Sequence, residues 1–558
     1  MIRTINNGGK EKMNLLNNAI ISTPNPVNEP IQSYAPGSPE RVRLKQALVE
    51  AAAKQLEIPL IIGGKEIKTG RLGKVVMPHD HQHVLAIYHK AGADEVRLAI
   101  DTAVAAQPLW QSFRWEERCA IFLKAAELLA GKYRALINAG AMLAGGKNAF
   151  QAEIDAACEL IDFLRFNVRY AQEIYAKQPE SSTGVWNYLQ HRPLEGFVLA
   201  VTPFNFTAIA GNLPTAPAIM GNTVVWKPAS SLVYTPYLIM QILEEAGLPP
   251  GVINFVPGSG AVVGDICLTD PNLAGVHFTG STRVFHQMWR TIGENIGKYR
   301  SYPRLVGETG GKDFVFAHTS ADVHALVTGL VRGAFEYQGQ KCSAASRAYI
   351  PNSIWPAVES GLRDAMARLK MGPPTDFRNF VGAVIDEGAF DTIAGFIDYA
   401  RNNAGGEILI GGNCDKSVGY FIEPTVILAT DPHFKTMVEE IFGPVLTVYV
   451  YDDQEYAATL DLCNTSSAYA LTGAVFARDR SAVSLALNRL EHAAGNFYIN
   501  DKPTGAVVGQ QPFGGGRASG TNDKAGSMAN LMRWVSTRTI KETFVPPVDC
   551  AYPFMVEE

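Results

Sequence analysis

From residue 196 onward, short apolar runs alternate with stretches of helical periodicity. The apolar runs lie at 197–201, 223–226, 252–256 and 275–278, and the helical stretches lie at about 207–219, 234–246, 261–268 and 283–297. Strands that are apolar along their whole length are typical of a parallel sheet covered by helices on both faces. The pattern therefore predicts an open α/β sheet, and such sheets bind ligands at the carboxyl ends of their strands.

A second block of the same kind follows. Its apolar runs lie near 303–306, 313–317, 347–350, 420–427, 445–450, 471–476 and 495–499. We place a second α/β domain there, at 304–524, and assign 38–180 together with 196–303 to the first domain. The chain is long enough for two or three such domains.

The region before residue 180 is expected to be mostly helical. Ser38-Pro39-Glu40 has the residues of a helix start, and that helix should run to about Gln55. Helical spacing covers 93–134, with Asp94 as its expected cap, and 151–175. A short hairpin is expected from Leu60 to Lys68 around two glycines.

Three segments fit neither domain. Residues 1–37 are rich in Asn and Pro and are expected to form an irregular arm. Segments 181–195 and 525–558 are expected to pair with each other or with another subunit, as a small oligomerisation flap. A homodimer or a larger homo-oligomer is the prediction.

Composition narrows the class of partner. The net charge is −5 and no long basic run occurs, so nucleic acid and anionic membranes are not expected ligands. The seven cysteines are scattered and no two are spaced as Cys-x-x-Cys, which indicates a reducing compartment without disulfides or a metal site. The first twenty residues lack a secretory or convincing organelle presequence, so we predict a cytoplasmic protein.

Residues 196–226 carry no charge and are long enough to span a bilayer. Three prolines interrupt the stretch, and its asparagines would place bare amides in lipid. We therefore interpret it as a buried core segment and predict no membrane span.

The strongest candidate for a nucleophile is Cys342, within 335–347. Gly339 lets the backbone turn before the thiol, Lys341 places a cation beside it, and the small Ser343 leaves the approach open. A thiolate in such a place can add to a carbonyl carbon. For an arbitrary cysteine, a small buried apolar side chain is the commoner outcome.

Other candidates follow strand ends. Asn205 could donate its side-chain amide to an oxyanion, although local backbone capping is the alternative. Glu308 stands in a glycine-rich bend and could act as a general base if burial raises its pKa; the alternative is a solvent-facing turn.

Four stretches suggest a nucleotide site. Lys227 ends a strand, where its ammonium could reach ribose hydroxyls, and Glu440 could accept hydrogen bonds from a sugar. The glycines at 258–264 are spaced G-x-G-x-x-x-G, unlike the usual dinucleotide fingerprint. The stretch 278–282 ends a strand and opens a helix, so it offers free backbone N–H groups to a phosphate or is simply a capped helix.

Together and in this order, these stretches resemble the aldehyde dehydrogenase superfamily. The motifs are Pro203-Phe204-Asn205, Trp226-Lys227-Pro228, Phe278-Thr279-Gly280-Ser281, the Glu-x-Gly-Gly-Lys of 308–312, the Gly-Gln-Lys-Cys of 339–342 and the Glu-Glu-Ile-Phe-Gly-Pro of 439–444. Within it, stretches 335–343, 496–502 and 504–523 look like the members that oxidise glutamate 5-semialdehyde, the 1-pyrroline-5-carboxylate dehydrogenases.

The resemblance implies a fold with a Rossmann-like NAD-binding domain and a catalytic domain, and it implies roles for individual residues. Cys342 would be the nucleophile, Asn205 an oxyanion donor and Glu308 the base that activates water. The cofactor, NAD, would be held by Lys227, Ser230, Gly280, Ser281, Thr282, Arg283, Val284, Glu440 and Phe442. The substrate would be bordered by Thr202, Phe206, Lys341, Ser343, Thr504, Gly505, Ala506 and Phe513.

Two departures concern the substrate. Some members carry Ser at the positions of Thr202 and Ala506; Thr202 keeps the hydroxyl, whereas Ala506 can offer only its backbone N–H. Two other functions stay open: an aldehyde dehydrogenase for a different aldehyde, and a catalytically silent structural relative.

Overall fold

The computed structural model of the chain describes residues 19–555 and 557. Residues 1–18 lie outside the described ones. Most of the segment considered for a targeting presequence and the first part of the predicted arm fall there. In the part that is described, no helix combines the length and the hydropathy needed to cross a bilayer. Within the same part, no group of three or more His, Cys, Asp or Glu side chains is placed to hold a metal ion.

The first domain is built on a seven-stranded sheet in the order β11-β10-β7-β8-β9-β2-β3. Its five parallel strands are β7 (Phe197–Val201), β8 (Thr223–Lys227), β9 (Ile253–Phe255), β10 (Leu273–Thr279) and β11 (Arg304–Glu308). The hairpin of β2 (Leu60–Ile62) and β3 (Lys65–Ile67) extends it antiparallel. The predicted strands and hairpin are confirmed. The sequence predicted β11 in the second domain, and this is wrong, because β11 pairs with β10 in the first sheet.

Helices connect these strands as predicted: α7 (Thr207–Ile219), α8 (Tyr234–Ala246), α9 (Gly260–Thr269) and α10 (Thr282–Glu294). Alternate residues of β7 enter different cores, because Val198 and Ala200 pack in one cluster and Phe197 and Leu199 in another. A strand buried on both faces must be apolar throughout, which explains why 196–226 has the composition of a membrane span.

The N-terminal helices are α1 (Pro39–Ala53), α2 (Ala93–Ser112), α3 (Trp115–Ala130), α4 (Arg134–Gly145), α5 (Ala149–Ala152), the π-helix η1 (Glu153–Glu159) and α6 (Leu160–Ala176). Ser38 caps α1 as expected. Asp94 does not cap α2, because the carboxylate of Glu95 accepts from the Gly92 N–H at 2.7 Å instead. Sequence reasoning also missed a three-stranded sheet of β1 (Leu56–Ile58), β4 (Leu72–Met77) and β5 (Asp80–His89).

The second domain has a seven-stranded sheet in the order β14-β17-β18-β13-β12-β20-β21. Its strands are β12 (Asp313–Ala317), β13 (Ala345–Pro351), β14 (Gly406–Ile410), β17 (Thr425–Ala429), β18 (Val445–Tyr451), β20 (Thr472–Phe476) and β21 (Asn496–Ile499). Only β14, an edge strand that the sequence did not predict, is antiparallel to its neighbour. The covering helices are α11 (Val323–Phe335), α12 (Trp355–Met366), α13 (Glu387–Asn402), α15 (Tyr456–Thr465) and α16 (Arg480–Arg489).

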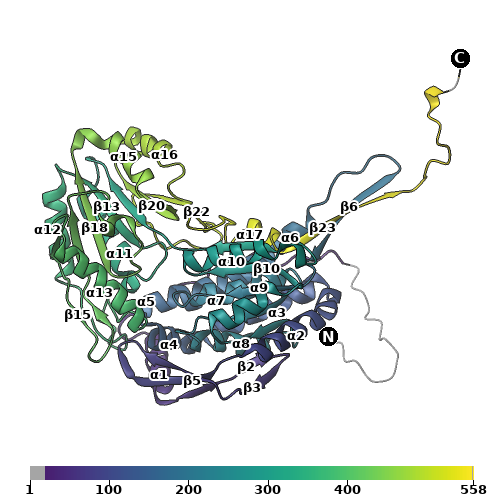
Figure 1. Cartoon of the computed structure of the whole chain (residues 1–558), viewed down its shortest axis with the longest axis horizontal. Helices are drawn as coiled ribbons and strands as arrows, with labels where there is room; N and C mark the ends of the chain where they lie inside the picture. The colour runs from purple at the N-terminus through teal and green to yellow at the C-terminus, as the bar shows by residue number, and fades with distance from the viewer. Residues whose placement is uncertain (1–18, 556, 558) are drawn as a thin grey trace.

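The two segments outside the domains pair with each other. Strand β6 (Val185–Pro193) runs antiparallel to β23 (Val535–Thr543) along its whole length, and the ribbon projects from the body of the molecule (Figure 1). Shorter elements are η2 (Ile296–Lys298), η3 (Glu336–Gly339), β15 (Cys414–Asp415), β16 (Phe421–Ile422), α14 (Lys435–Val438), η4 (Asp453–Glu455), β19 (Tyr469–Ala470), β22 (Gly516–Arg517), α17 (Met528–Met532) and η5 (Pro553–Met555).

Candidate active site

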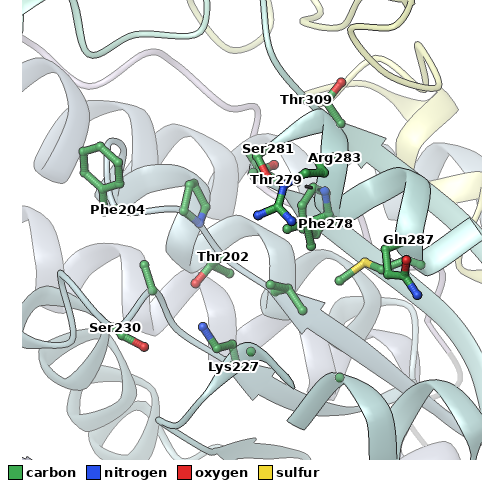
Figure 2. A pocket seen from close by; sticks show the side chains of 18 of the residues that line it. Thr202, Phe204, Lys227, Ser230, Phe278, Thr279, Ser281, Arg283, Gln287 and Thr309 are labelled. Atoms are coloured by element: carbon green, nitrogen blue, oxygen red, sulfur yellow. Dashed lines mark hydrogen bonds between the residues drawn. The ribbon is translucent and has the colours of Figure 1, made fainter. Parts of the chain in front are cut away.

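A cavity of about 740 Å³ lies where the carboxyl ends of β7, β8 and β10 meet residues of the second domain. Thr202 directly follows β7, and Lys227 is the last residue of the neighbouring β8. Figure 2 shows both side chains facing the same space as Arg283 of α10. The predicted site residues on its wall are Thr202, Asn205, Lys227, Ser230, Gly280, Ser281, Arg283, Val284, Cys342, Glu440 and Phe442. Residues from both domains therefore enclose one site.

Cys342 lies in the loop between η3 and β13, and the backbone before it is tightly folded. Tyr337, Gln338 and Gly339 all have positive φ, at 53°, 56° and 66°. A Cβ at position 339 would stand 2.1 Å from the carbonyl oxygen of Gly443, so only glycine fits there. The Gln338 amide donates to the carbonyl oxygens of Gly146 and Ala383, both at 2.9 Å, which anchors the loop to the first domain and to the stretch after β13.

The Cys342 side chain is buried and lines the cavity. Burial raises its pKa well above the usual range, and the facing carboxyl groups of Asp313, Glu308 and Glu440 raise it further. Lys341 does not provide the acidifying cation that the sequence suggested, because its ammonium pairs with the buried Glu336 carboxylate at 3.1 Å. A raised pKa favours the thiol over the thiolate, so Cys342 must lose its proton before it can attack.

Asn205 follows β7 and reaches the same cavity wall as Cys342. Its side chain is 3% exposed, and its amide makes no hydrogen bond to any described residue. The alternative, in which Asn205 caps local backbone, is therefore not what the structure has. A buried amide without a partner can donate to an oxygen of a bound molecule.

Glu308 ends β11 but does not line the cavity. Its Oε2 is buried without a hydrogen-bond partner among the described residues, and a Cβ on Gly514 would stand 3.0 Å from its Oε1. Burial raises the pKa of Glu308 well above its usual range, opposed by Lys524 and increased by Asp523. A raised pKa makes the ionised carboxylate a stronger base, and the role of general base stays a prediction for Glu308. The alternative of a solvent-facing turn is wrong, because the carboxyl oxygen Oε2 is buried.

The predicted cofactor residues surround the larger part of the cavity. Burial lowers the pKa of Lys227 to about 8. The Glu440 Oε1 accepts from the Gly311 N–H at 2.8 Å, and burial raises the pKa of Glu440 to about 7. The Ser281 hydroxyl caps α10 through the Val284 N–H, so this helix start is a capped one whose first turn also faces the cavity.

Thr282 lies apart from the other cofactor residues. It is absent from the cavity wall, and its Oγ1 accepts from the Gly310 N–H at 3.2 Å. Its placement is therefore structural in this conformation, since it ties α10 to the bend that follows Glu308.

The predicted substrate residues other than Thr202 do not line this cavity. Ser343 donates to the Thr504 hydroxyl at 2.9 Å, which ties the turn 504–506 to the nucleophile loop. Gly505 has a φ of +101°, so the turn needs glycine there. The Phe206 ring lies 4.6 Å from the Lys147 ammonium, and Phe513 pairs through its backbone with Ala525.

Sequence reasoning missed the apolar walls of the cavity. Gly260 and Gly264 of α9 lie on the wall, with Val263 and Leu268 of α9 and Met288 of α10. The glycine pattern at 258–264 was the available signal, and its unusual spacing made it weak. A buried cluster of titratable groups was also missed, namely Lys147, whose ammonium lies near the Phe206 ring, Asp155 and Glu159.

Comparisons with known proteins show what the chain is similar to. The model described as the aldehyde dehydrogenase family matches residues 67–540. The chain is 54% identical to a protein of Dictyostelium discoideum named delta-1-pyrroline-5-carboxylate dehydrogenase, mitochondrial, over 96% of each chain. It is also 54% identical to the delta-1-pyrroline-5-carboxylate dehydrogenase of Agaricus bisporus, over 94% of this chain and 96% of that one. The Delta-pyrroline-5-carboxylate dehydrogenase from Mycobacterium tuberculosis bound with NAD matches with a TM-score of 0.93 at 54% identity, covering 97% of this chain and 100% of that chain.

Proposed function

The chain belongs to the aldehyde dehydrogenase family, and we propose that it oxidises L-glutamate 5-semialdehyde, in equilibrium with 1-pyrroline-5-carboxylate, to L-glutamate with NAD. The observation that carries this is that Cys342 and the unpaired Asn205 amide line the same cavity. The names and the high identity of the relatives supply the substrate. The reaction is the second step of proline degradation.

The cavity fits a dinucleotide. Its walls of Val263, Leu268 and Met288 are apolar, as a stacked base requires, and the start of α10 presents N–H groups and a positive dipole end to phosphate. Lys227 and Glu440 lie where they can hold ribose hydroxyls. When bound, NAD would supply the hydride acceptor needed to oxidise the adduct of Cys342 and the aldehyde to a thioester.

The protein's own groups perform the remaining chemistry. The sulfur of Cys342, once deprotonated, adds to the aldehyde carbon and forms a thiohemiacetal. The Asn205 amide and the backbone N–H of Cys342 donate to the oxyanion of that adduct. Glu308, in its ionised form, takes a proton from the water that attacks the thioester, and glutamate leaves.

Substrate choice is assigned to the turn at 504–506, whose consecutive backbone N–H groups can bind the α-carboxylate. An ordinary turn is the alternative. With Ala506→Asp we expect the KM for glutamate semialdehyde to rise about tenfold or more, about 1.4 kcal/mol for each tenfold, because like charge opposes the carboxylate. Activity toward an uncharged aldehyde of similar length should fall far less. Equal loss on both substrates would mean that the turn supports only the shape of the site.

Cofactor choice is proposed to depend on Ser230, which lies three residues beyond Lys227. The Ser230 hydroxyl donates to the Gly258 carbonyl oxygen at 3.3 Å. This neutral side chain does not repel the 2′-phosphate of NADP, so we expect NAD to be preferred with measurable NADP use. In Ser230→Glu, kcat/KM with NADP should fall about tenfold more than with NAD. If the unchanged protein shows no activity with NADP, another group excludes it.

The function is tested by a substrate panel with purified protein and NAD. NADH should form on addition of pyrroline-5-carboxylate, with a kcat/KM well above that for uncharged aldehydes of similar length. A preference for uncharged aldehydes would identify another aldehyde dehydrogenase. Absence of NADH with every aldehyde would identify a silent relative.

The assembly and the compartment are further parts of the proposal. A homodimer or larger homo-oligomer is supported by the projecting ribbon of β6 and β23, on which Trp186 is 53% exposed, and by Phe544 beyond it. Light scattering of the purified protein measures the molar mass. The predicted cytoplasmic location stays a prediction that cell fractionation tests, and the Dictyostelium relative is named as a mitochondrial protein.

A further inference from the structure

Residues 23–34, here called the strap, lie across η1 and α6 of the first domain without regular secondary structure of their own. Thr23 donates to the Gln172 side chain at 2.7 Å through both its backbone N–H and its hydroxyl. The Glu29 carboxylate pairs with Arg134 and Arg165, and the Tyr34 hydroxyl donates to Glu153 at 2.7 Å. The strap is therefore fixed at both ends and in its middle.

Asn28 of the strap joins the first domain to a loop of the second. Its Nδ2 donates to Asp162 Oδ2 of α6 and to the Val508 carbonyl oxygen, both at 2.8 Å. Its Oδ1 accepts from Gln510 Nε2 at 2.9 Å. Two acceptors face the amide nitrogen and one donor faces the amide oxygen, so the side chain has one self-consistent orientation.

The loop that Asn28 holds is a tight turn directly after 504–506. The N–H groups of Gln510 and Gln511 both donate to the Val507 carbonyl oxygen at 3.0 Å, and the Gln511 side chain accepts from the Val507 N–H. Gly509 has a φ of +82°, and a Cβ there would stand 2.2 Å from the Phe166 ring of α6. The turn is closed on itself and pressed against α6, so a displacement at one end is transmitted to the other.

At its other end the turn reaches the nucleophile loop. Thr504 accepts from Ser343, the residue after Cys342. The segment 504–506 thus lies between two fixed points, the hydrogen bond to Ser343 and the Asn28 amide at Val508 and Gln510. Where these points stand determines where the N–H groups of Gly505 and Ala506 are directed.

We propose that Asn28 is a positioning residue for substrate specificity: by holding the turn 507–511 on α6, its amide directs the backbone N–H groups of 504–506 toward the carboxylate of the substrate. The inference rests on the proposed function, because it concerns the same substrate. Asn28 does not touch the reacting atoms, so it affects binding of the carboxylate end more than the chemical step.

The test is Asn28→Ala. We expect the KM for glutamate semialdehyde to rise about tenfold, since small displacements of binding groups have effects of that order or larger, while kcat stays within about twofold. The KM for an uncharged aldehyde of similar length should also stay within about twofold. The variant should fold, because the Glu29 N–H still donates to Asp162 Oδ1 at 2.8 Å and keeps the strap in place.

Two further variants sharpen the result. Asn25→Ala is the matched control, since Asn25 lies on the same strap, is exposed and makes no hydrogen bond to a described residue; its kinetics should equal those of the unchanged protein. Gln510→Ala removes the donor to Asn28, and its effect on KM should not add to that of Asn28→Ala, because both act through one contact.

The kinetic results distinguish a positioning role of Asn28 from a purely structural one. A KM for glutamate semialdehyde within twofold in Asn28→Ala overturns the proposal, as does an equal loss on charged and uncharged aldehydes, which means that Asn28 only supports the fold. Loss of oxidation by the unchanged protein is a different result, because it overturns the proposed function itself.

Discussion

Cys342→Ala is expected to lower kcat/KM for glutamate semialdehyde by at least about 10⁴-fold while NAD affinity stays within about twofold. The thiol forms the covalent bond to the substrate, and without it neither the thiohemiacetal nor the thioester can form. Cys342 is one of many residues that line the cavity, so most of the surface proposed to hold the dinucleotide is unchanged. Steady-state NADH formation and calorimetric titration with NAD measure the two quantities.

The matched control is Cys414→Ala, at an exposed cysteine in the second domain. It should keep full activity. Thermal unfolding of both variants shows whether either change affects the fold, since removing a buried sulfur leaves little more than one atom of space. Comparable turnover by a folded Cys342→Ala variant would remove Cys342 from the mechanism.

Glu308→Gln is expected to slow steady-state turnover by about 10² to 10⁴-fold, the usual range for loss of a general base. The change preserves shape and removes the proton acceptor, so hydrolysis of the thioester should become the slow step. Rapid mixing with substrate and NAD should then show a burst of NADH of about one equivalent per site, followed by a slow phase. Equal slowing of the burst and the slow phase would give Glu308 a role before the thioester.

The pH dependence of the slow phase follows from the pKa of Glu308, which burial raises well above its usual range. A raised pKa keeps the carboxyl group protonated and inactive as a base at acidic pH. Hydrolysis by the unchanged protein should therefore increase as pH rises through that raised pKa. The Glu308→Gln variant should lack this increase.

Much of the fold could be predicted because hydrophobic pattern and backbone geometry agree along the chain. The apolar runs at 197–201 and 223–226 became the neighbouring strands β7 and β8, since strands buried on both faces have no other composition. The sheet of β1, β4 and β5 was missed because its strands are partly exposed and carry charged and polar residues such as those of Asp80–His89. The strand β11 was assigned to the wrong sheet, since an apolar run does not identify its partner.

The candidate site was predictable where a residue type and a strand end coincide, as for Asn205 and Lys227. The pKa shifts of the site residues could not be predicted, because they depend on burial and on ionic partners that the local sequence does not reveal. Lys341 directly precedes Cys342 in the chain, yet its ammonium pairs with the Glu336 carboxylate. Burial has the largest effect on the pKa of the Cys342 thiol. The contact of Asn28 with Val508 spans 480 residues, so no local pattern could indicate it.

Trapping the acyl-enzyme tests the proposed covalent mechanism through Cys342 most directly. Glu308→Gln protein mixed with pyrroline-5-carboxylate and NAD should be quenched in acid during the burst, digested, and mapped by mass spectrometry. The proposed mechanism predicts a glutamyl group on the peptide that contains Cys342, at a yield that matches the NADH burst, and none without NAD. NADH formed with no acyl group on Cys342, or an acyl group on another cysteine, would contradict it.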